Sequence, residues 1–436
     1  MKTNVLVSAC LLFGILALSS CSIQQKIARS ARTSLLETPS FLPAHTGISI
    51  YEPATGKYWY QYQSDKYFVP ASNTKLLTCF AAMRHLGDSL IGIRYVNKGN
   101  GRVEVEGNAD ASFLMPDFKA QPVYEFLKQQ RELLLTDANW NDNPLGMGWA
   151  WDDYNSDYMQ ERSAFPIYGN LTWIKDTPAL RVTPGYLFDS VLAAVQGLSH
   201  HFRLTRSISD NHFYASMAKT PFGLVQIPFH TTGNTVLLQA LRDTLHTRVQ
   251  AAHFKLDRLP DVQIIHSQPT DSLLRIMMHR SDNFFAEQTL LMISNDWLGT
   301  MNDRKIIDTL LHSDYKDLPQ KPKWVDGSGL SRYNLVTPDD LVWILTQMKA
   351  RFPWPRIQAI LATGGDGTLG SLYKNYKGKI YAKTGTLSNH VALSGFMITN
   401  KGKQLVFSIL VNAHQTSAAN IRKGIETFLT GLMDHY

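Results

Sequence analysis

The sequence predicts an α+β protein in which an antiparallel sheet lies between helices and a mostly β region is inserted into the chain. Three observations lead to this. Two β-rich runs begin near residue 46, and three more lie near the C-terminus, with helical patterns between them. From about residue 91 to 255 short strand-like runs replace the helical period. Strands from both ends of a chain can share one sheet that helices cover.

The N-terminal part of this plan is a hairpin followed by a helix. Residues 21–45 are expected to form a linker followed by a short helix. The runs GISIYEP and KYWYQYQ, joined by ATG, then indicate a β-hairpin. A helix is expected from about Ser72 to Leu86, where Gly87 ends it. Its apolar residues lie nearly all round, so we expect it to be buried.

The middle of the chain carries the predicted insertion. RVEVEG alternates as a strand does, and TWIKDTPALRVTP and HFRLTRSIS are further short β-like runs. A segment rich in tryptophan and aspartate, NWNDNPLGMGWAWDDYNSDY, lies among them. None has a strong helical period. We therefore assign residues 91–255 to an inserted β-rich region, flanked by one domain made of residues 46–90 and 256–436.

Helical patterns return after the insertion and precede three strands. TDSLLRIMMHRSDNFFAEQTLLMIS and TPDDLVWILTQMKARF are both helical, and in the second Thr337 is the N-cap and Pro338 lies in the first turn. KGKIYAKTGTLS, VALSGFMITN and KQLVFSILVN follow as strands. The last helix places five apolar residues on one face: Ile421, Ile425, Phe428, Leu429 and Leu432.

Composition limits the class of protein. The chain has 436 residues, 44% of them hydrophobic and 18% charged, which suits an ordered globular protein of two or three domains. The net charge of +7 is scattered, and the lack of a dense basic run argues against nucleic acid as a partner. The fourteen histidines show no metal-ligand spacing, and His200-His201 is most simply a surface pair. We expect no metal, nucleotide or other cofactor.

The N-terminus resembles an export signal. MKTNVLVSACLLFGILALSSC has one lysine, an apolar stretch and then small residues. Its last four letters resemble a bacterial lipoprotein cleavage box, which implies removal of residues 1–20 and lipidation of Cys21. The expected location is then periplasmic, with a lipid anchor in a bacterial membrane. The alternative is an ordinary signal peptide with an incidental cysteine. Cys79 is left without a partner, so no disulfide framework is expected.

The first candidate for chemistry is Ser72-Asn73-Thr74-Lys75. Residues three apart on a helix share a face, so Ser72 and Lys75 are expected to meet. A serine hydroxyl becomes a nucleophile when a base takes its proton, and a lysine serves as that base when burial or a nearby cation lowers its pKa. Alone, the motif is weak. A capping serine beside a solvated lysine is then the commoner explanation.

Two later fragments reverse that judgement. Ser281-Asp282-Asn283 lies near a helix, and Lys383-Thr384-Gly385 lies on a predicted strand. Ser-x-x-Lys, Ser-Asp-Asn and Lys-Thr-Gly, in this order, are the motif set of serine β-lactamases and penicillin-binding proteins. Their joint presence after an export signal is hard to attribute to chance.

Longer segments extend the match. VDGSGLSRYNLVTPDDL, EGNADASF, GWAWDDY, RSDNFFAEQ and GGDGTLGSLYKN resemble the D-alanyl-D-alanine carboxypeptidase/endopeptidase family of low-molecular-mass class C penicillin-binding proteins. The resemblance covers nearly all of the chain after residue 45. It implies a transpeptidase-like domain with a five-stranded antiparallel sheet between helices and a helical cluster, and extra domains between the first and second motifs. GNADASF and LATGGDGTL depart from the usual patterns of the family.

The resemblance also implies roles for the motif residues. Ser72 attacks the carbonyl carbon of a D-Ala-D-Ala peptide, and Lys75 is the expected general base. Ser281 relays a proton toward the leaving amine, and Asn283 hydrogen-bonds Lys75 and the substrate. Lys383 and Thr384 attract the terminal carboxylate, and Gly385 lets the substrate backbone lie close to the strand. The backbone N–H groups of Ser72 and Thr386 are expected to form the oxyanion hole.

Several weaker candidates lie outside the motifs. The resemblance implies that Arg332 holds a substrate carboxylate, with a structural salt bridge as the alternative. Asp153 is a candidate for the amino group of the stem peptide, although a turn-capping aspartate is the favoured explanation. Asp326 is expected to organise its glycine-rich turn. Trp149 and Trp151 are expected to be core residues.

The function expected from all of this is a serine D-Ala-D-Ala carboxypeptidase of the envelope that acts on peptidoglycan stem peptides, with DD-endopeptidase activity as an additional expectation. β-Lactams are expected to acylate it. One alternative is a serine β-lactamase, although no Glu-x-x-Leu-Asn loop is evident between the first two motifs. The other is a catalytically slow penicillin-binding scaffold protein.

Overall fold

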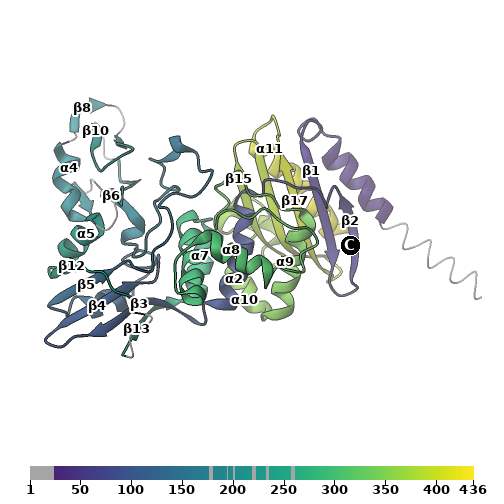
Figure 1. The fold of residues 1–436 in the computed structure, drawn as a ribbon. Coiled ribbons are helices and arrows are strands. Elements are labelled where there is room, and N and C mark those ends of the chain that lie inside the picture. Colours follow the sequence, from purple (N-terminus) through teal and green to yellow (C-terminus); the bar gives the residue numbers. More distant parts are fainter. Residues whose placement is uncertain are drawn as a thin grey trace, which may run out of the picture. The chain divides into compact units, whose positions relative to one another are not determined.

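The structure is a computed structural model that describes residues 24–175, 180–193, 195–199, 202–218, 222–231, 235–256 and 261–436 (Figure 1). The chain divides into two compact units. The first contains the residues up to Leu76 together with Asp317–Trp324 and Tyr333–Tyr436. The second contains Leu77–Lys316 and Val325–Arg332. It therefore extends beyond residues 91–255, which we expected as the insertion.

The first unit is built on one antiparallel sheet with the strand order β14-β15-β16-β17-β1-β2. The predicted sharing of strands between the two ends of the chain is confirmed, because Ile48 of β1 pairs with Ile409 of β17. Five strands were expected, and a sixth of two residues, β14, is added at one edge. The strands are β1 His45–Glu52, β2 Lys57–Tyr62, β14 Ala362–Thr363, β15 Ile380–Leu387, β16 His390–Ile398 and β17 Gln404–Asn412.

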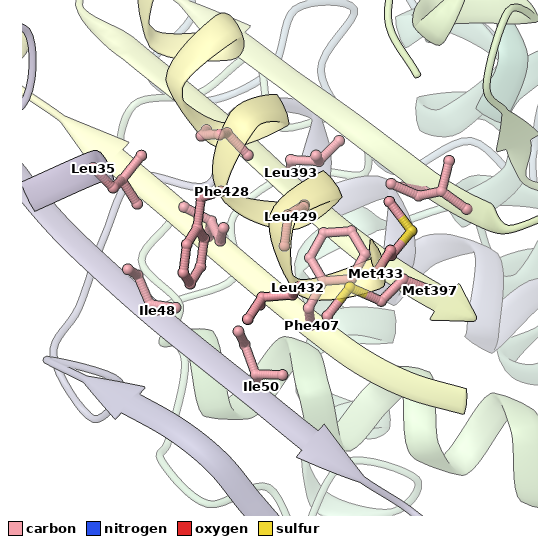
Figure 2. Close-up of a cluster of buried hydrophobic side chains, with 14 of the residues drawn as sticks. Leu35, Ile48, Ile50, Leu393, Met397, Phe407, Phe428, Leu429, Leu432 and Met433 are labelled. Atoms are coloured by element: carbon pink, nitrogen blue, oxygen red, sulfur yellow. The ribbon is translucent and has the colours of Figure 1, made fainter. Parts of the chain in front are cut away.

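One face of this sheet is covered by the C-terminal helix α11, Ala418–His435, and by the N-terminal segment. Residues 24–31 are helical and continue into a π-helical turn, Arg32–Leu36, so the expected short helix is present and begins at the first described residue. The five predicted apolar residues of α11 are at most 1% exposed. Figure 2 shows Leu35 and Phe428 beside Ile48 and Ile50 of β1. This apolar layer fixes the sheet on one side.

The opposite face is covered by α9, Pro338–Arg351, which contacts β1, β16 and β17. Because side chains alternate along a strand, Ser49 points away from Ile48 and Ile50, and its hydroxyl donates to Asp339 of α9. The predicted cap is confirmed. Thr337 accepts from the Asp340 amide, and the Asp340 side chain accepts from the Thr337 amide. Helix α10, Trp354–Ile360, follows.

The second unit contains a five-stranded mixed sheet, β12-β5-β4-β3-β13, and two three-stranded sheets, β11-β6-β7 and β8-β10-β9. RVEVEG forms β4 as predicted. The strands are β3 Ser89–Asn97, β4 Arg102–Gly107, β5 Glu132–Thr136, β6 Leu171–Lys175, β7 Arg181–Thr183, β8 Val195–Ser199, β9 Arg203–Arg206, β10 Phe213–Ala218, β11 Leu224–Pro228, β12 Arg248–Ala251 and β13 Gln263–Pro269.

The second unit also contains helices that the sequence analysis missed. They are α3 Pro122–Leu127, α4 Phe188–Ala193 and α5 Thr235–Leu245. The expectation that no segment of this region is strongly helical was wrong for α5, because Val236, Leu237, Ala240 and Leu241 form one buried face. This helical period is present in the sequence, but it was missed because it lies among β-like runs.

The long helical pattern after the insertion is two helices. They are α6, Thr270–His279, and α7, Asn283–Leu298, and α8, Asp303–His312, follows them. The break falls at the Ser-Asp-Asn motif. Ser281 has a φ of +62°, an unusual backbone conformation for a residue other than glycine. Asp282 is the N-cap of α7, since its side chain accepts from the Phe285 amide.

A buried charge cluster connects parts of the second unit. The Arg162 guanidinium donates to Asp303 at 2.6 Å and to Asp142 at 3.1 Å, and lies 3.4 Å from Glu287. Glu287 also accepts from the Ser328 amide at 2.8 Å. Burial, followed by the nearby Asp326 carboxylate, raises the pKa of Glu287 to about 8. Glu287 therefore links α7 to the turn at Ser328, and its raised pKa favours the protonated form.

The first prediction concerns the pH dependence of stability. The folded state binds the Glu287 proton more tightly than the unfolded chain does, so this contribution is present at low pH and is lost as pH rises toward 8. We expect the free energy of unfolding to fall by about 2 kcal/mol more in the wild type than in Glu287→Gln between pH 6 and pH 8. Thermal unfolding of both proteins across this range measures the difference. Parallel pH profiles would contradict the assignment.

Candidate active site

Ser72 lies on a tight turn at the start of a buried helix. Ala71–Thr74 form a 3₁₀ turn, and the α-helix α2 runs from Lys75 to His85, whereas one helix from Ser72 was expected. In a 3₁₀ turn the side chains of residues three apart are almost eclipsed. Lys75 Nζ accordingly lies 3.1 Å from Ser72 Oγ, within hydrogen-bonding distance. The serine and the lysine of the motif therefore meet as predicted.

The turn is held in place by amides on both sides. The Asn412 side chain, at the end of β17, accepts from the Val69 amide at 2.7 Å and donates to the Val69 carbonyl at 3.0 Å. Asn73 Nδ2 donates to the Lys383 carbonyl of β15 at 2.9 Å. Ala71 has a φ of +48°, a conformation that residues other than glycine seldom adopt. These contacts fix the position of Ser72 against the sheet.

Gly385 allows β15 to approach the serine. A Cβ atom at this position would lie 2.8 Å from the Pro70 carbonyl oxygen and 3.1 Å from the Ser72 nitrogen. Both neighbours are backbone atoms of the turn, so neither can move aside without displacing Ser72. The Lys-Thr-Gly strand and the Ser-x-x-Lys turn thus lie in direct contact within the first unit, and the glycine is required by space.

Two lysine side chains are buried in this contact. Lys75 and Lys383 are both 0% exposed. Burial lowers the pKa of Lys383 well below its usual value, and the neighbouring charge of Lys75 lowers it further. Lys383 Nζ lies 2.7 Å from the Thr384 carbonyl oxygen, to which it donates. The site therefore holds two amines that disfavour each other's charge, one of them beside a serine hydroxyl.

An arginine that the sequence analysis did not single out lies at the end of the same strand. Thr384 is half-buried and Thr386 exposed, and both point to one face of β15 because they are two residues apart. Arg422 Nη2, on α11, donates to Thr386 Oγ at 2.6 Å. A guanidinium cannot accept a hydrogen bond, so the Thr386 hydroxyl proton remains available to a ligand. No local motif marks Arg422, because the packing of α11 on the sheet brings it to Thr386.

Ser281 and Asn283 belong to the second unit, where they line a pocket of about 490 Å³. Asn283 Nδ2 donates to the Tyr158 carbonyl at 3.0 Å. The charged side chains of this pocket include Asp117 and Arg280, which form an ion pair at 2.8 Å. The second motif therefore lies on a polar concave surface of its own unit.

The weaker candidates also lie in the second unit. The Asp326 carboxylate accepts from the amides of Gly329 at 2.8 Å and Ser331 at 2.7 Å, so it organises its turn. Arg332 is an exposed residue at the end of that turn. The Asp153 carboxylate accepts from the Tyr158 hydroxyl at 2.8 Å.

We expected Trp149 and Trp151, the two tryptophans near Asp153, to be core residues, and neither is fully buried. Trp151 is 73% exposed, so that expectation was wrong for this residue. Trp149 is half-buried, and its indole N–H donates to Asp326 at 3.0 Å. A tryptophan on an irregular loop lacks the periodic neighbours that would have indicated its exposure.

The cysteines divide between described and undescribed parts of the chain. Cys79 is fully buried in α2, which suits a packing role. Cys21, the signal at residues 1–20 and the pair His200-His201 lie outside the described residues. Within the described part of the chain, no helix has the length and apolar character needed to span a membrane.

Comparison with known proteins places this arrangement in a family. The model of the D-Ala-D-Ala carboxypeptidase 3 (S13) family matches residues 29–187 and 236–432. The chain is 23% identical over 408 residues to the D-alanyl-D-alanine carboxypeptidase DacB of Haemophilus influenzae, covering 81% of this chain and 82% of that one. It is 26% identical over 443 residues to the D-alanyl-D-alanine carboxypeptidase of Actinomadura sp. strain R39, covering 88% and 81%.

Solved structures confirm the predicted fold class. Penicillin-binding protein 4 of Haemophilus influenzae superposes with a TM-score of 0.69 at 18% identity, over 93% of this chain and 98% of that one. A predatory peptidoglycan endopeptidase of Bdellovibrio bacteriovorus gives a TM-score of 0.51 at 14% identity, over 89% and 92%. With the family match spanning most of the sequence, the chain belongs to the D-Ala-D-Ala carboxypeptidase 3 (S13) family, and its enzyme class is that of a serine-type D-Ala-D-Ala carboxypeptidase.

Proposed function

We propose that this protein is an envelope enzyme that hydrolyses peptidoglycan stem peptides through an acyl-enzyme on Ser72, with carboxypeptidase activity and additional DD-endopeptidase activity. The observation that carries the proposal is the 3.1 Å contact between Ser72 Oγ and Lys75 Nζ, beside the buried Lys383 of the Lys-Thr-Gly strand. The family assignment supports D-Ala-D-Ala peptides as the substrate class. β-Lactams, which present a strained amide to the same serine, are proposed to acylate it.

The proposed reaction begins with the lysine pair. Burial and the neighbouring charge of Lys75 lower the pKa of Lys383 well below its usual value. We therefore propose that one amine of the pair is neutral when the substrate arrives. When a substrate carboxylate approaches Lys383, its charge favours the ammonium on Lys383 and leaves the neutral amine on Lys75. Lys75 then takes the Ser72 proton while Oγ bonds to the carbonyl carbon. Carboxylate capture thereby prepares the base for a substrate with a free carboxylate.

The later steps follow from the same groups. The backbone N–H groups of Ser72 and Thr386 are proposed to stabilise the tetrahedral oxyanion, where loss of one donor costs about 3 kcal/mol of barrier. The C–N bond then breaks, the leaving amine takes a proton, and D-alanine departs. Ser281 is proposed to relay that proton, and Asn283 to hydrogen-bond Lys75 and the acyl-side amide, on the basis of their motif. Water then hydrolyses the ester and restores the Ser72 hydroxyl.

Binding roles are proposed for other residues. Thr384 and Thr386 bind the terminal carboxylate, with Arg422 positioning Thr386, and Gly385 keeps the strand close to the substrate backbone. Arg332 is proposed to bind a second carboxylate of the stem peptide. For Asp153 we propose a contact with its amino group, although its bond to Tyr158 equally suits a structural residue of the loop.

The location of the enzyme is proposed from the N-terminal sequence and from the cell-wall relatives. Processing would remove residues 1–20 and attach lipid to Cys21, and the enzyme would then be held at a bacterial membrane in the periplasm. Mass spectrometry of the N-terminal peptide of the protein made in bacteria tests this anchor. A mature chain that begins elsewhere, or a Cys21 without lipid, would overturn it.

Ser72→Ala is the direct test of the nucleophile. Incubation with fluorescent penicillin should label the wild type and leave Ser72→Ala unlabelled, while circular dichroism and thermal unfolding stay unchanged. D-Alanine release from a pentapeptide should disappear with the label. Retained labelling would mean that another serine is the nucleophile. In the wild type, rapid loss of label would favour a β-lactamase, and stable label without D-alanine release would favour a scaffold protein.

Gly385→Ala tests the close approach of β15 to the turn. The new methyl group should push the backbone at Pro70 and Ser72 outward, and a shift of about 1 Å at a reacting group costs roughly 100-fold in rate. We expect acylation by penicillin to slow by about that factor. Gly431→Ala on α11 is the control, because nothing lies within 4 Å of its added Cβ. Equal acylation rates in the two variants would contradict the assignment.

Arg422→Ala tests the carboxylate end of the site. A hydrogen bond to a charged group contributes about 1.5–3 kcal/mol, so KM for a D-Ala-D-Ala peptide should rise about 10-fold with little change in kcat. Lys423→Ala, which removes a neighbouring positive charge, is the control for general electrostatic attraction. If both variants raise KM equally, Arg422 has no positioning role.

A further inference from the structure

The first unit has a basic surface at the end of its sheet opposite to Ser72. Lys57 follows the β1–β2 turn, and Lys401 and Lys403 lie in the β16–β17 turn, so three lysines gather where these two turns lie. We call Lys57, Lys401 and Lys403 the basic end. They line a cavity of about 310 Å³. All three side chains are exposed.

Aromatic side chains lie among these lysines. The rings of Trp59 and Tyr436 meet edge to face at 5.6 Å. Lys403 Nζ lies 5.2 Å from the Trp59 ring, and Lys401 Nζ lies 6.0 Å from the Tyr436 ring. Trp59 is only 8% exposed and belongs to the core, so the half-buried Tyr436 is the ring that the basic end presents. A tyrosine beside lysines suits a surface that contacts lipid head groups, since its ring is amphipathic and the cations pair with phosphate.

Two acidic residues, Glu52 and Asp434, also lie at this end. Glu52 is buried and accepts from Lys403 at 2.9 Å and from the Trp59 indole at 3.1 Å. Asp434 accepts from the Tyr376 hydroxyl at 2.7 Å. Asp434 is exposed and keeps its charge, because Tyr376 is a neutral donor. Lys403 is paired with Glu52, and Lys401 Nζ donates to the neutral His435 carbonyl at 3.2 Å. Lys57 and Lys401 are therefore the exposed lysines that the basic end offers to an anionic partner.

The described N-terminus lies at the basic end. Gln24 lines the same cavity, and its side chain donates to the Tyr58 carbonyl at 3.2 Å. The helix that it begins is fixed to the unit, because Ile27, Ala31 and Leu35 are 0% exposed in the core. Three residues span at most about 11 Å, so a lipid on Cys21 would bring the bilayer surface close to Gln24.

The register of the sheet separates this surface from the catalytic serine. β17 begins at Gln404, next to Lys403, and ends at Asn412, whose side chain holds the turn before Ser72 (Figure 1). Thr386 pairs with Val391, which pairs with Val411, so the Lys-Thr-Gly end of β15 lies at the Asn412 end. At about 3.4 Å per residue, the length of β17 places the two ends roughly 27 Å apart.

We propose that the basic end docks on the anionic phospholipid head groups of the membrane that holds the anchor, and that the sheet thereby directs Ser72 away from the bilayer toward the peptidoglycan. This rests on the proposed lipid at Cys21. The short connection from Cys21 to Gln24 supplies the proximity, and the lysines supply the charge complementarity. A lipid anchor alone would leave the orientation of the site free, whereas docking fixes it.

The test uses the full chain, made and acylated in bacteria and reconstituted into vesicles. A fluorophore is attached to Ala54→Cys, in the β1–β2 turn, or to Gln415→Cys, just after the Asn412 end, since both positions are exposed and Cys79 is buried. In vesicles containing phosphatidylglycerol, head-group spin labels should quench the fluorophore at residue 54 and not the one at 415. The quenching at residue 54 should be largely lost in neutral phosphatidylcholine vesicles.

Charge reversal provides the matched comparison. Lys57→Glu with Lys401→Glu should abolish most of the quenching at residue 54 while the protein stays vesicle-bound. Lys374→Glu with Lys423→Glu, an equal change on exposed lysines outside the basic end, should leave it intact. Equal quenching at residues 54 and 415 would overturn the docking. So would quenching at residue 54 that is independent of lipid charge and unchanged in both pairs of lysine variants.

Two further readouts separate this proposal from those on which it rests. If the protein made in bacteria carries no lipid on Cys21 and does not bind vesicles, the proposed anchor is wrong, and the docking proposal fails with it. Fluorescent penicillin labelling of every variant reports on the enzyme. Normal labelling with absent quenching overturns the docking alone, and absent labelling in the wild type overturns the enzymatic proposal without changing the quenching result.

Discussion

Two buried lysine amines beside one serine are the constraint around which the first unit is organised. Lys75 and Lys383 are inaccessible to water, and each disfavours the charge of the other. In water both would be protonated, and neither would accept a proton from a serine. Burial of both amines in the folded protein lowers the pKa of Lys383 and so favours the loss of one charge from the pair. The proposed chemistry depends on that loss.

The sheet supplies the alignment. Helices α9 and α11 cover its two faces, so β15 and β17 can hold polar side chains at their ends without exposing the interior. Asn73 and Asn412 then attach the serine turn to the ends of these strands. Gly385 has no Cβ, and a Cβ at this position would keep β15 and the Ser72 turn apart. The hydrophobic layer in Figure 2 holds the sheet in place. The ends of the strands then hold the Ser72 turn through hydrogen bonds.

Sequence reasoning reached the local features of this arrangement. The strands of the first unit alternate clearly, α9 carries its own cap, and Ser72 and Lys75 are close in sequence, so their contact is local. The features that escaped it depend on tertiary register. Arg422 meets Thr386 only because α11 lies across the sheet, and the break at Ser281 interrupts a continuous apolar pattern that is compatible with one helix. Trp151, which we expected in the core, is exposed on an irregular loop, where no hydrophobic period indicates whether a side chain is buried.

The protonation of Lys383 tests the central claim most directly. NMR titration of isotope-labelled lysine side chains, with Lys383→Arg used to assign the signal, follows its charge in the intact protein. We predict that Lys383 titrates well below the ordinary lysine value of about 10.4, and that its pKa rises in Lys75→Ala, where the neighbouring charge is gone. A Lys383 that keeps its charge up to the ordinary range, with or without Lys75, would contradict the account.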